Sequence, residues 1–169
     1  EMRSVNDQDI DVEQGQSGEI LLKGDNILFE YWGNEAATKD AIRDGWFYTG
    51  DIGYQDEDQD VWVNDRKKDV VISGSENIYP AEIEAFMHEM EDIIDGVIVG
   101  KPDEKWGEVP VAVVIKKKGV DLVEDDFLSR FQGQLARYKH PKAVYFVNDL
   151  PRNAMGKVLK YEVRKSVTS

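Results

Sequence analysis

The sequence feature that most constrains the fold is residues 65–84, DRKKDVVISGSENIYPAEIE. It joins a cationic cluster, residues 66–68, to the short apolar segment 70–72 and then to small residues at 73–75. Pro80 follows at a place that suits the first turn of a helix, where proline's missing N–H costs nothing. Apolar residues then recur at helical spacing. The run therefore predicts a strand, a tight turn and a helix in immediate succession.

The charge balance changes within the same run. Residues 1–65 contain 17 acidic residues (Asp and Glu) and four basic residues (Lys and Arg), whereas residues 66–169 contain 17 acidic and 17 basic residues. The whole net charge of −13 therefore comes from residues 1–65. Such a break predicts two structural units, 1–65 and 66–169. The acidic first unit argues against nucleic acid as a partner, because the phosphate backbone would repel it. The acids could also serve only to solubilise a surface.

Composition excludes several other classes of protein. The chain has no cysteine, so we expect no disulfide framework and no thiolate metal site. It has no apolar run long enough for a transmembrane helix, and its first residues lack the apolar region of a signal peptide. These features favour a reducing, cytoplasmic setting. The first residue is Glu1 and not Met, so we expect a piece of a longer protein.

The acidic part reads as short strands and turns. Its apolar residues fall in pieces too short to build a good core alone, so we expect a β-rich tail of a larger domain. The expected elements are strands at 19–23 and 27–29, a helix at 34–43, and a hairpin from 53–54 to 61–63 with an acidic tip at 55–60.

The second part reads as a complete small α+β domain, with a three-stranded sheet, helices and a hairpin. Residues 109–115 are continuously apolar, which predicts a central strand covered on both faces. Asp121 and Glu124 have the spacing of a capping box and predict the start of a helix. The remaining expected elements are strands at 70–72, 96–100 and 143–147 and helices after Pro80 and at 160–165.

Three side chains suggest nucleotide chemistry. Asp51 follows Gly50 at an expected turn, and its carboxylate could accept both hydroxyls of a ribose, although an Asp in this place is usually a plain turn residue. The planar guanidinium of Arg66 suits ribose and phosphate oxygens, or belongs to a solvated basic cluster. Lys157 follows PRNAMG, a run expected to be flexible, and could neutralise charge in a closing site or be an ordinary surface lysine.

Three segments together resemble the adenylate-forming enzymes, the superfamily of acyl-CoA synthetases, luciferases and peptide-synthetase adenylation domains. They are GWFYTGDIG at 45–53, the run at 65–84, and PRNAMGK at 151–157. GEILLKG at 18–24 and YWGN at 31–34 also resemble a motif of that family. The motifs stand in the family's order and span nearly the whole chain.

The resemblance assigns roles to individual residues. It implies that Asp51 and Arg66 bind the nucleotide, that Lys68 is the hinge between two domains, and that Lys157 is the catalytic lysine. The loop of Ser73, Gly74 and Ser75 would line the tunnel for the pantetheine arm of CoA. The family often has Gly where this chain has Ser75. No metal-binding residue is implied.

The resemblance also implies an activity and a domain arrangement. Residues 1–65 would be the tail of an N-terminal AMP-binding domain, and residues 66–169 a mobile C-terminal domain. The intact enzyme would be an acyl-CoA synthetase that uses ATP, CoA and Mg²⁺ to convert a carboxylic acid to an acyl-AMP and then to a thioester. This chain alone, without the rest of its N-terminal domain, is expected to be inactive and to hold none of these ligands tightly.

Other readings remain open within and beyond the family. The segment NIYPAEIE at 77–84 resembles the CoA ligases more than the amino-acid-activating domains. A luciferase-like member of the superfamily would share the same C-terminal part. A non-catalytic α+β binding module is the alternative from another class.

Overall fold

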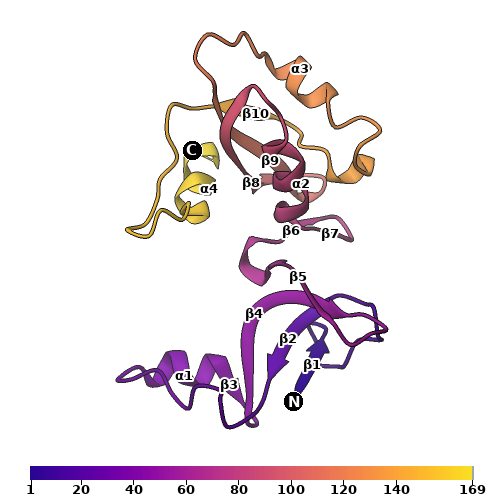
Figure 1. The fold of residues 1–169 in the computed structure, drawn as a ribbon, viewed down its shortest axis with the longest axis vertical. Helices are drawn as coiled ribbons and strands as arrows, with labels where there is room; N and C mark the ends of the chain where they lie inside the picture. The colour runs from indigo at the N-terminus through magenta and orange to yellow at the C-terminus, as the bar shows by residue number, and fades with distance from the viewer. Residues whose placement is uncertain (169) are drawn as a thin grey trace. The chain divides into compact units, whose positions relative to one another are not determined.

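The computed structural model describes residues 1–168, and the chain forms two compact units, Glu1–Lys68 and Asp69–Ser169 (Figure 1). Each unit has its own five-stranded sheet. The division follows Lys68, whereas the charge balance changes between Asp65 and Arg66. The difference has a local cause: Arg66 still ends a strand of the first sheet, and a single 3₁₀ turn, Lys67–Asp69, carries the chain out of it.

The sheet of the first unit is antiparallel throughout and centres on one long strand, β4. The strand order is β1-β2-β4-β3, and β5 also pairs with β4. The expected hairpin is confirmed as β4 and β5 with the acidic residues at its tip. The elements are β1 (Met2–Val5), β2 (Gly18–Leu22), α1 (Glu35–Ala41), β3 (Ile42–Arg43), β4 (Trp46–Gln55) and β5 (Val61–Arg66).

Of two further elements expected in this unit, the strand at 27–29 is absent and the helix at 34–43 is present. Residues 27–29 form no strand, because the short apolar run finds no neighbour to pair with and lies in the loop before α1. The expected helix at 34–43 is confirmed but shorter, at Glu35–Ala41. Asn34 is its N-cap, and its Oδ1 accepts a hydrogen bond from the Ala37 amide at 3.0 Å.

The first unit buries little apolar surface. Of the 23 buried hydrophobic side chains of the described residues, only Val5, Ile20 and Leu21 belong to it. Large apolar side chains are instead exposed, with Phe29 and Trp32 about nine-tenths accessible at 89% and 93%. The sparse core agrees with the expectation that these residues cannot build a good core alone.

The second unit has a sheet of five strands, which corrects the expected three. The order is β10-β9-β6-β7, and β8 also pairs with β9. The expected strand at 70–72 is confirmed as β6, which forms a hairpin with β7 and joins the sheet through the pairing of Ser73 with Gly107 at the start of β9. The strands are β6 (Val71–Ser73), β7 (Glu76–Ile78), β8 (Ile93–Asp103), β9 (Gly107–Lys116) and β10 (Val144–Phe146).

The central strands β8 and β9 are covered on both faces, as the continuous apolar run predicts. Side chains alternate between the faces of a strand. Ile98, Ala112 and Val114 belong to one buried cluster with α2 (Pro80–His88) and α3 (Glu124–Ser129). Their neighbours in the strands belong to a second cluster with α4 (Lys160–Thr168). This α+β arrangement provides the rigid support for both loops of the candidate site that lie in this unit.

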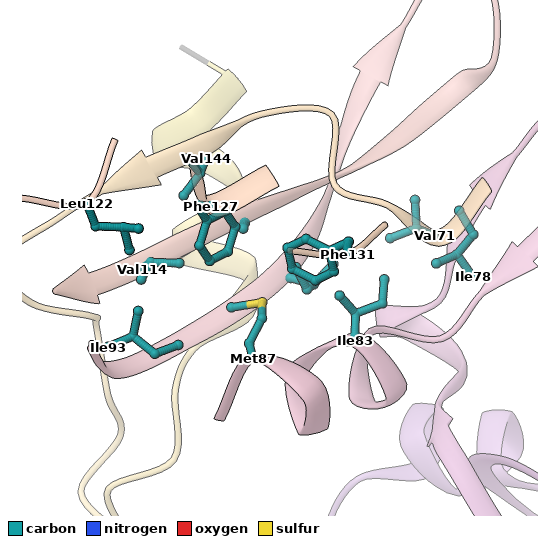
Figure 2. Packing of buried hydrophobic residues seen from close by; sticks show 12 residues of the cluster. Val71, Ile78, Ile83, Met87, Ile93, Val114, Leu122, Phe127, Phe131 and Val144 are labelled. Carbon is teal, nitrogen blue, oxygen red and sulfur yellow. The ribbon is translucent and has the colours of Figure 1, made fainter. Parts of the chain in front are cut away.

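Aromatic side chains fill the centre of the first cluster (Figure 2). Phe131 meets Phe127 and Phe86 edge-to-face, with ring centroids 5.3 Å apart in each pair. Figure 2 shows Met87 and Ile83 of α2 below the ring of Phe131. The apolar spacing of residues 83–90 therefore correctly predicted the buried side of α2.

The expected capping box at α3 is wrong. The helix begins at Glu124 with Val123 as N-cap and no side-chain cap. Glu124 Oε1 instead accepts a hydrogen bond from the Val144 amide at 3.1 Å, so it joins α3 to β10. The expected closing helix at 160–165 is confirmed as the longer α4. No helix of residues 1–168 is long and apolar enough to cross a membrane.

Candidate functional site

The sequence predicted a turn at Asp51, but the residue lies within strand β4. Gly50 has a φ of +71°, a value that glycine adopts without strain, and the pairing of β2 with β4 shifts register here. We call Thr49, Gly50 and Asp51 the β4 bulge. Thr49 Oγ1 donates to the Ile20 carbonyl at 2.7 Å and accepts from the Asp51 amide at 3.0 Å. The bulge therefore turns the carboxylate while the strand continues.

Asp51 and Arg66 form the polar pair expected to contact a nucleotide. They are cross-strand partners in β4 and β5, and Arg66 Nε lies 3.0 Å from Asp51 Oδ1. The same guanidinium donates from NH1 to the Thr49 carbonyl at 3.0 Å. Both side chains stay accessible, at 46% for Arg66 and 35% for Asp51. A carboxylate and a guanidinium held side by side at a surface can accept from and donate to one ligand.

Lys68 is exposed and is the last residue of the first unit. It sits in the single 3₁₀ turn that links the two sheets. Its predecessor Lys67 is bound to the first unit, with Nζ 3.0 Å from Glu19 Oε2 and 3.1 Å from Asp7 Oδ1. Partial burial lowers the pKa of Lys67, but the hydrogen bonds and charges of Glu19 and Asp7 outweigh this and leave the pKa raised.

The loop of Ser73, Gly74 and Ser75 is the tight turn between β6 and β7. Gly74 has a φ of +64°, and its amide donates to the Trp106 carbonyl at 2.7 Å. A Cβ at this position would lie 3.1 Å from Trp106 Cε3. Trp106 thus covers the turn from the β8–β9 loop while remaining 46% exposed. Both the backbone conformation and the space beside Trp106 favour glycine here.

The loop that carries Lys157 is an ordered turn, although its composition suggested a flexible run. Asn153 Oδ1 accepts hydrogen bonds from the amides of Met155 at 3.0 Å and Lys157 at 2.9 Å. The Asn153 amide donates to the Lys157 carbonyl at 2.9 Å. Among the described residues, the Lys157 ammonium has no ion pair. The turn therefore presents an exposed cation on a defined backbone.

An ion pair ties this turn to the sheet. Arg152 donates from NH1 to the Gly156 carbonyl at 2.8 Å and from NH2 to Asp95 in β8. Asp95 also contacts His88 at the end of α2, with 3.3 Å between Oδ1 and Nε2. Burial raises the pKa of Asp95, but Arg152, the Gly96 amide and His88 outweigh it, so the pKa is lowered. Asp95 therefore stays ionised and holds the base of the Lys157 turn.

Metal binding has little support from side chains. Among residues 1–168 no group of three or more His, Asp or Glu residues could hold a metal ion. The Mg²⁺ that the family resemblance implies finds no ligand set in this part of the chain.

Comparison with known proteins identifies part of the second unit. The AMP-binding enzyme C-terminal domain matches residues 82–157. This chain contains an AMP-binding enzyme C-terminal domain. The matched segment starts in α2 and ends at Lys157, so it includes strands β8, β9 and β10 and the lysine turn, whereas β6 and β7 lie before it.

Relatives extend the likeness to both units. Indoleacetate–CoA ligase of Aromatoleum aromaticum is 48% identical over 166 residues, which are 98% of this chain and 32% of that protein. ATP-bound MatB of Rhodopseudomonas palustris is 38% identical with a TM-score of 0.90, covering 100% of this chain and 34% of MatB. The o-succinylbenzoate CoA synthetase of Bacillus subtilis, in complex with its acyl-adenylate, is 35% identical with a TM-score of 0.88, covering 97% and 33%.

The chain thus spans about a third of the length of the relatives that it matches. Two of these relatives are named as a CoA ligase and a CoA synthetase, and the third is an ATP-bound protein. The two solved structures share the α+β fold of this chain.

The structure groups the candidate residues by unit. Asp51, Arg66 and Lys68 belong to the first, and the Gly74 loop and Lys157 to the second, which carries the AMP-binding enzyme C-terminal domain. Sequence reasoning missed Glu19, which reads as an ordinary residue of a short strand. It also missed the support of Asn153 and Asp95. Of these residues only Asn153 could have been found from the sequence, because an Asn shortly before Gly156 is typical of a turn.

Proposed function

We propose that the intact protein is an ATP-dependent acid–CoA ligase and that this chain is its C-terminal third. The observation that carries the proposal is the Asp51–Arg66 pair, 3.0 Å apart at a surface and directly before the boundary between the two units. The naming of every relative compared above as a CoA ligase, a CoA synthetase or an ATP-bound protein supports it. On this proposal, residues 1–68 complete an N-terminal AMP-binding domain and the rest is a C-terminal domain that turns.

Nucleotide binding is the task of the first unit in this proposal. The carboxylate of Asp51 accepts hydrogen bonds from the ribose hydroxyls, because an ionised oxygen is the stronger acceptor. Arg66 donates to ribose or phosphate oxygens and also keeps Asp51 oriented across the strand pair. The β4 bulge supplies the orientation that a regular strand would not, since it rotates the side chain out of the pleat.

The first half-reaction joins the acid to AMP. A carboxylate oxygen of the substrate attacks the α-phosphorus of ATP, the bond to the β-phosphate oxygen breaks, and pyrophosphate leaves. Charge builds on the oxygens around phosphorus in this step, and a positioned cation stabilises it. Lys157 has the required properties, because its side chain is exposed, its ammonium has no ion pair within the described residues, and its backbone is held by Asn153.

The second half-reaction transfers the acyl group to CoA. The thiol sulfur attacks the acyl carbon, its proton is lost, and the bond to AMP breaks. The turn at Ser73, Gly74 and Ser75 lines the path of the pantetheine arm in this proposal, and Lys68 provides the backbone freedom for the second unit to present it. A Cβ at residue 74 would lie 3.1 Å from Trp106 Cε3, so a side chain here would crowd the space beside this turn.

The remainder of the N-terminal domain is the partner that the first unit lacks. The nearly complete exposure of Phe29 and Trp32 supports this, because large apolar side chains in loops are usually covered in the functional assembly. Mg²⁺ would enter with ATP and not through ligands in these residues. A cytoplasmic location stays a prediction.

The test is an assay of the intact protein with ATP, Mg²⁺ and a panel of aliphatic and aromatic acids. We expect acid-dependent pyrophosphate release, followed by AMP and thioester formation when CoA is added. Residues 1–169 alone should release none. Turnover by this chain alone would contradict the domain assignment. Activation of amino acids without thioester formation would favour an adenylation domain, and absence of any turnover would favour a binding module.

A further inference from the structure

Glu19 in β2 is the one charged or polar residue of the described chain that is buried, with 7% of its surface accessible. Moving a carboxylate out of water is costly unless the lost hydration is replaced by hydrogen bonds and an opposite charge. Its hydrogen-bond and ion-pair partners therefore show how the lost hydration is replaced.

The two oxygens of Glu19 bind two different segments. Oε1 accepts a hydrogen bond from the Gly50 amide at 3.2 Å, within the β4 bulge. Oε2 accepts from the ammonium of Lys67 at 3.0 Å. Gly50 directly precedes Asp51, and Lys67 directly follows Arg66 and precedes Lys68. The buried carboxylate of Glu19 thus contacts sequence neighbours of Asp51, Arg66 and Lys68. Asp51 and Arg66 are the residues proposed to hold the nucleotide, and Lys68 is the proposed hinge.

Lys67 precedes the proposed hinge residue Lys68 and is held to the first unit through its side chain. Its ammonium is held by Glu19 and also by Asp7 at 3.1 Å, and both partners belong to the first unit. The next residue, Lys68, is exposed, and Asp69 begins the second unit. These contacts hold the side chain next to the proposed hinge residue Lys68 to the first unit.

We propose that Glu19 is a positioning residue that couples the nucleotide-holding bulge to the fixed side of the hinge. The inference rests on the proposed function. Through Oε1 it fixes the backbone that aims Asp51, and through Oε2 it fixes the point from which the second unit turns. It touches neither substrate nor nucleotide, so its effect on the reaction passes through Gly50 and Lys67.

The two contacts can be separated by substitution. In the double variant Glu19→Gln/Lys67→Met, the glutamine oxygen still accepts from the Gly50 amide, while the hinge anchor is lost. No buried charge is left without a partner, so the cost of a broken ion pair is avoided. In Glu19→Ala both contacts of Glu19 are lost, and Lys67 keeps only its ion pair with Asp7. The matched control is Asp11→Asn, which removes the exposed ion pair between Arg3 and Asp11 of the same unit.

The experiment measures each half-reaction in the intact protein, together with AMP affinity and thermal stability. For the double variant we expect AMP affinity, adenylate formation and melting temperature close to those of the unchanged protein. Transfer from preformed acyl-adenylate to CoA should slow about tenfold, within the range seen for residues that couple two sites. Glu19→Ala should in addition weaken AMP binding by about tenfold. Asp11→Asn should change none of these quantities.

Two results would overturn the proposal. Thioester formation within about twofold of the unchanged protein in the double variant would show that the Lys67 contact is only structural. Unchanged AMP affinity in Glu19→Ala would show that the Gly50 contact does not aim Asp51. If the unchanged protein makes adenylate and a variant shows either result, only this inference is contradicted. A protein that makes no adenylate before any substitution contradicts the proposed function.

Discussion

Arg66 Nε lies 3.0 Å from Asp51 Oδ1, its direct cross-strand neighbour, and the same guanidinium reaches the Thr49 carbonyl at 3.0 Å. The arginine thus contacts both the side chain and the backbone of the β4 bulge. Because Asp51 remains partly exposed, the pair is fixed in orientation without being closed to a ligand. This relationship provides the most direct test of nucleotide binding by the first unit.

Asp51→Asn should weaken AMP binding by the intact protein about tenfold or more, because a hydrogen bond to a charged group contributes about 1.5–3 kcal/mol. Folding should change little, since an accessible ion pair contributes about 1 kcal/mol or less. Titration calorimetry measures the affinity, with Asp11→Asn as the control for loss of one exposed carboxylate. Equal affinity in Asp51→Asn and the control would remove Asp51 from the site.

Gly74→Ala should both destabilise the second unit and slow CoA transfer. The new Cβ would lie 3.1 Å from Trp106 Cε3 at a φ of +64°. Gly133→Ala is the matched control, because Gly133 has a φ of +76° and no atom within 4 Å of a built Cβ. Urea denaturation should show a loss of about 1 kcal/mol for the control and a larger loss for Gly74→Ala. Only Gly74→Ala should raise the KM for CoA.

Asn153→Ala should lower the rate of adenylate formation without weakening nucleotide binding. The change removes the acceptor for the Met155 and Lys157 amides, so the lysine turn loses its fixed shape. Asn153→Asp keeps an acceptor in place and should retain most of the rate. Rapid-quench measurement of acyl-adenylate separates the two variants. Equal rates in both would mean that the turn does not position Lys157.

The ion pair of Asp92 with Arg130 predicts a pH dependence of stability. Hydrogen bonding to Arg130 lowers the pKa of Asp92 below its ordinary value of 3.8, against the opposing effect of burial. A lowered pKa gives stability that is present above the ordinary value and lost as the pH falls through the folded-state value. Asp92→Asn should therefore reduce the free energy of unfolding at neutral pH, by about 1 kcal/mol, and this deficit should shrink below pH 3.8.

Urea denaturation of the protein between neutral pH and the acid range measures this deficit. Asp25→Asn, which changes an exposed carboxylate of the first unit, is the control and should show no deficit at any pH. A deficit for Asp92→Asn that stays constant into the acid range would contradict an electrostatic origin.

The sequence predicted best where a pattern is local. Pro80 with apolar residues at helical spacing predicted α2, and the continuous run at 109–115 predicted a strand buried on both faces. It failed where the outcome depends on distant partners. Glu124 had the spacing of a capping box, yet its carboxylate accepts a hydrogen bond from the Val144 amide instead. Residues 27–29 had the composition of a strand and found no partner strand.

The same distinction applies to the candidate site. Asp51, Arg66 and Lys157 stand in recognisable motifs, so the sequence alone singled them out. Glu19 could not be found in this way, because its burial depends on Gly50 and Lys67, which are 31 and 48 residues away in the chain. Asp95 likewise meets Arg152 across 57 residues. Motifs mark the groups that would touch a ligand, and only the fold shows the groups that hold them.

The central claim is that Lys157 promotes adenylate formation, and Lys157→Ala in the intact protein tests it most directly. The control is Lys118→Ala, another exposed lysine beside a glycine of positive φ. Pre-steady-state measurement should show acyl-adenylate formation slowed about 10²–10³-fold in Lys157→Ala, the usual loss when one charge-stabilising group is removed. ATP affinity and stability should match the control. Adenylate formation at the control's rate would contradict the account.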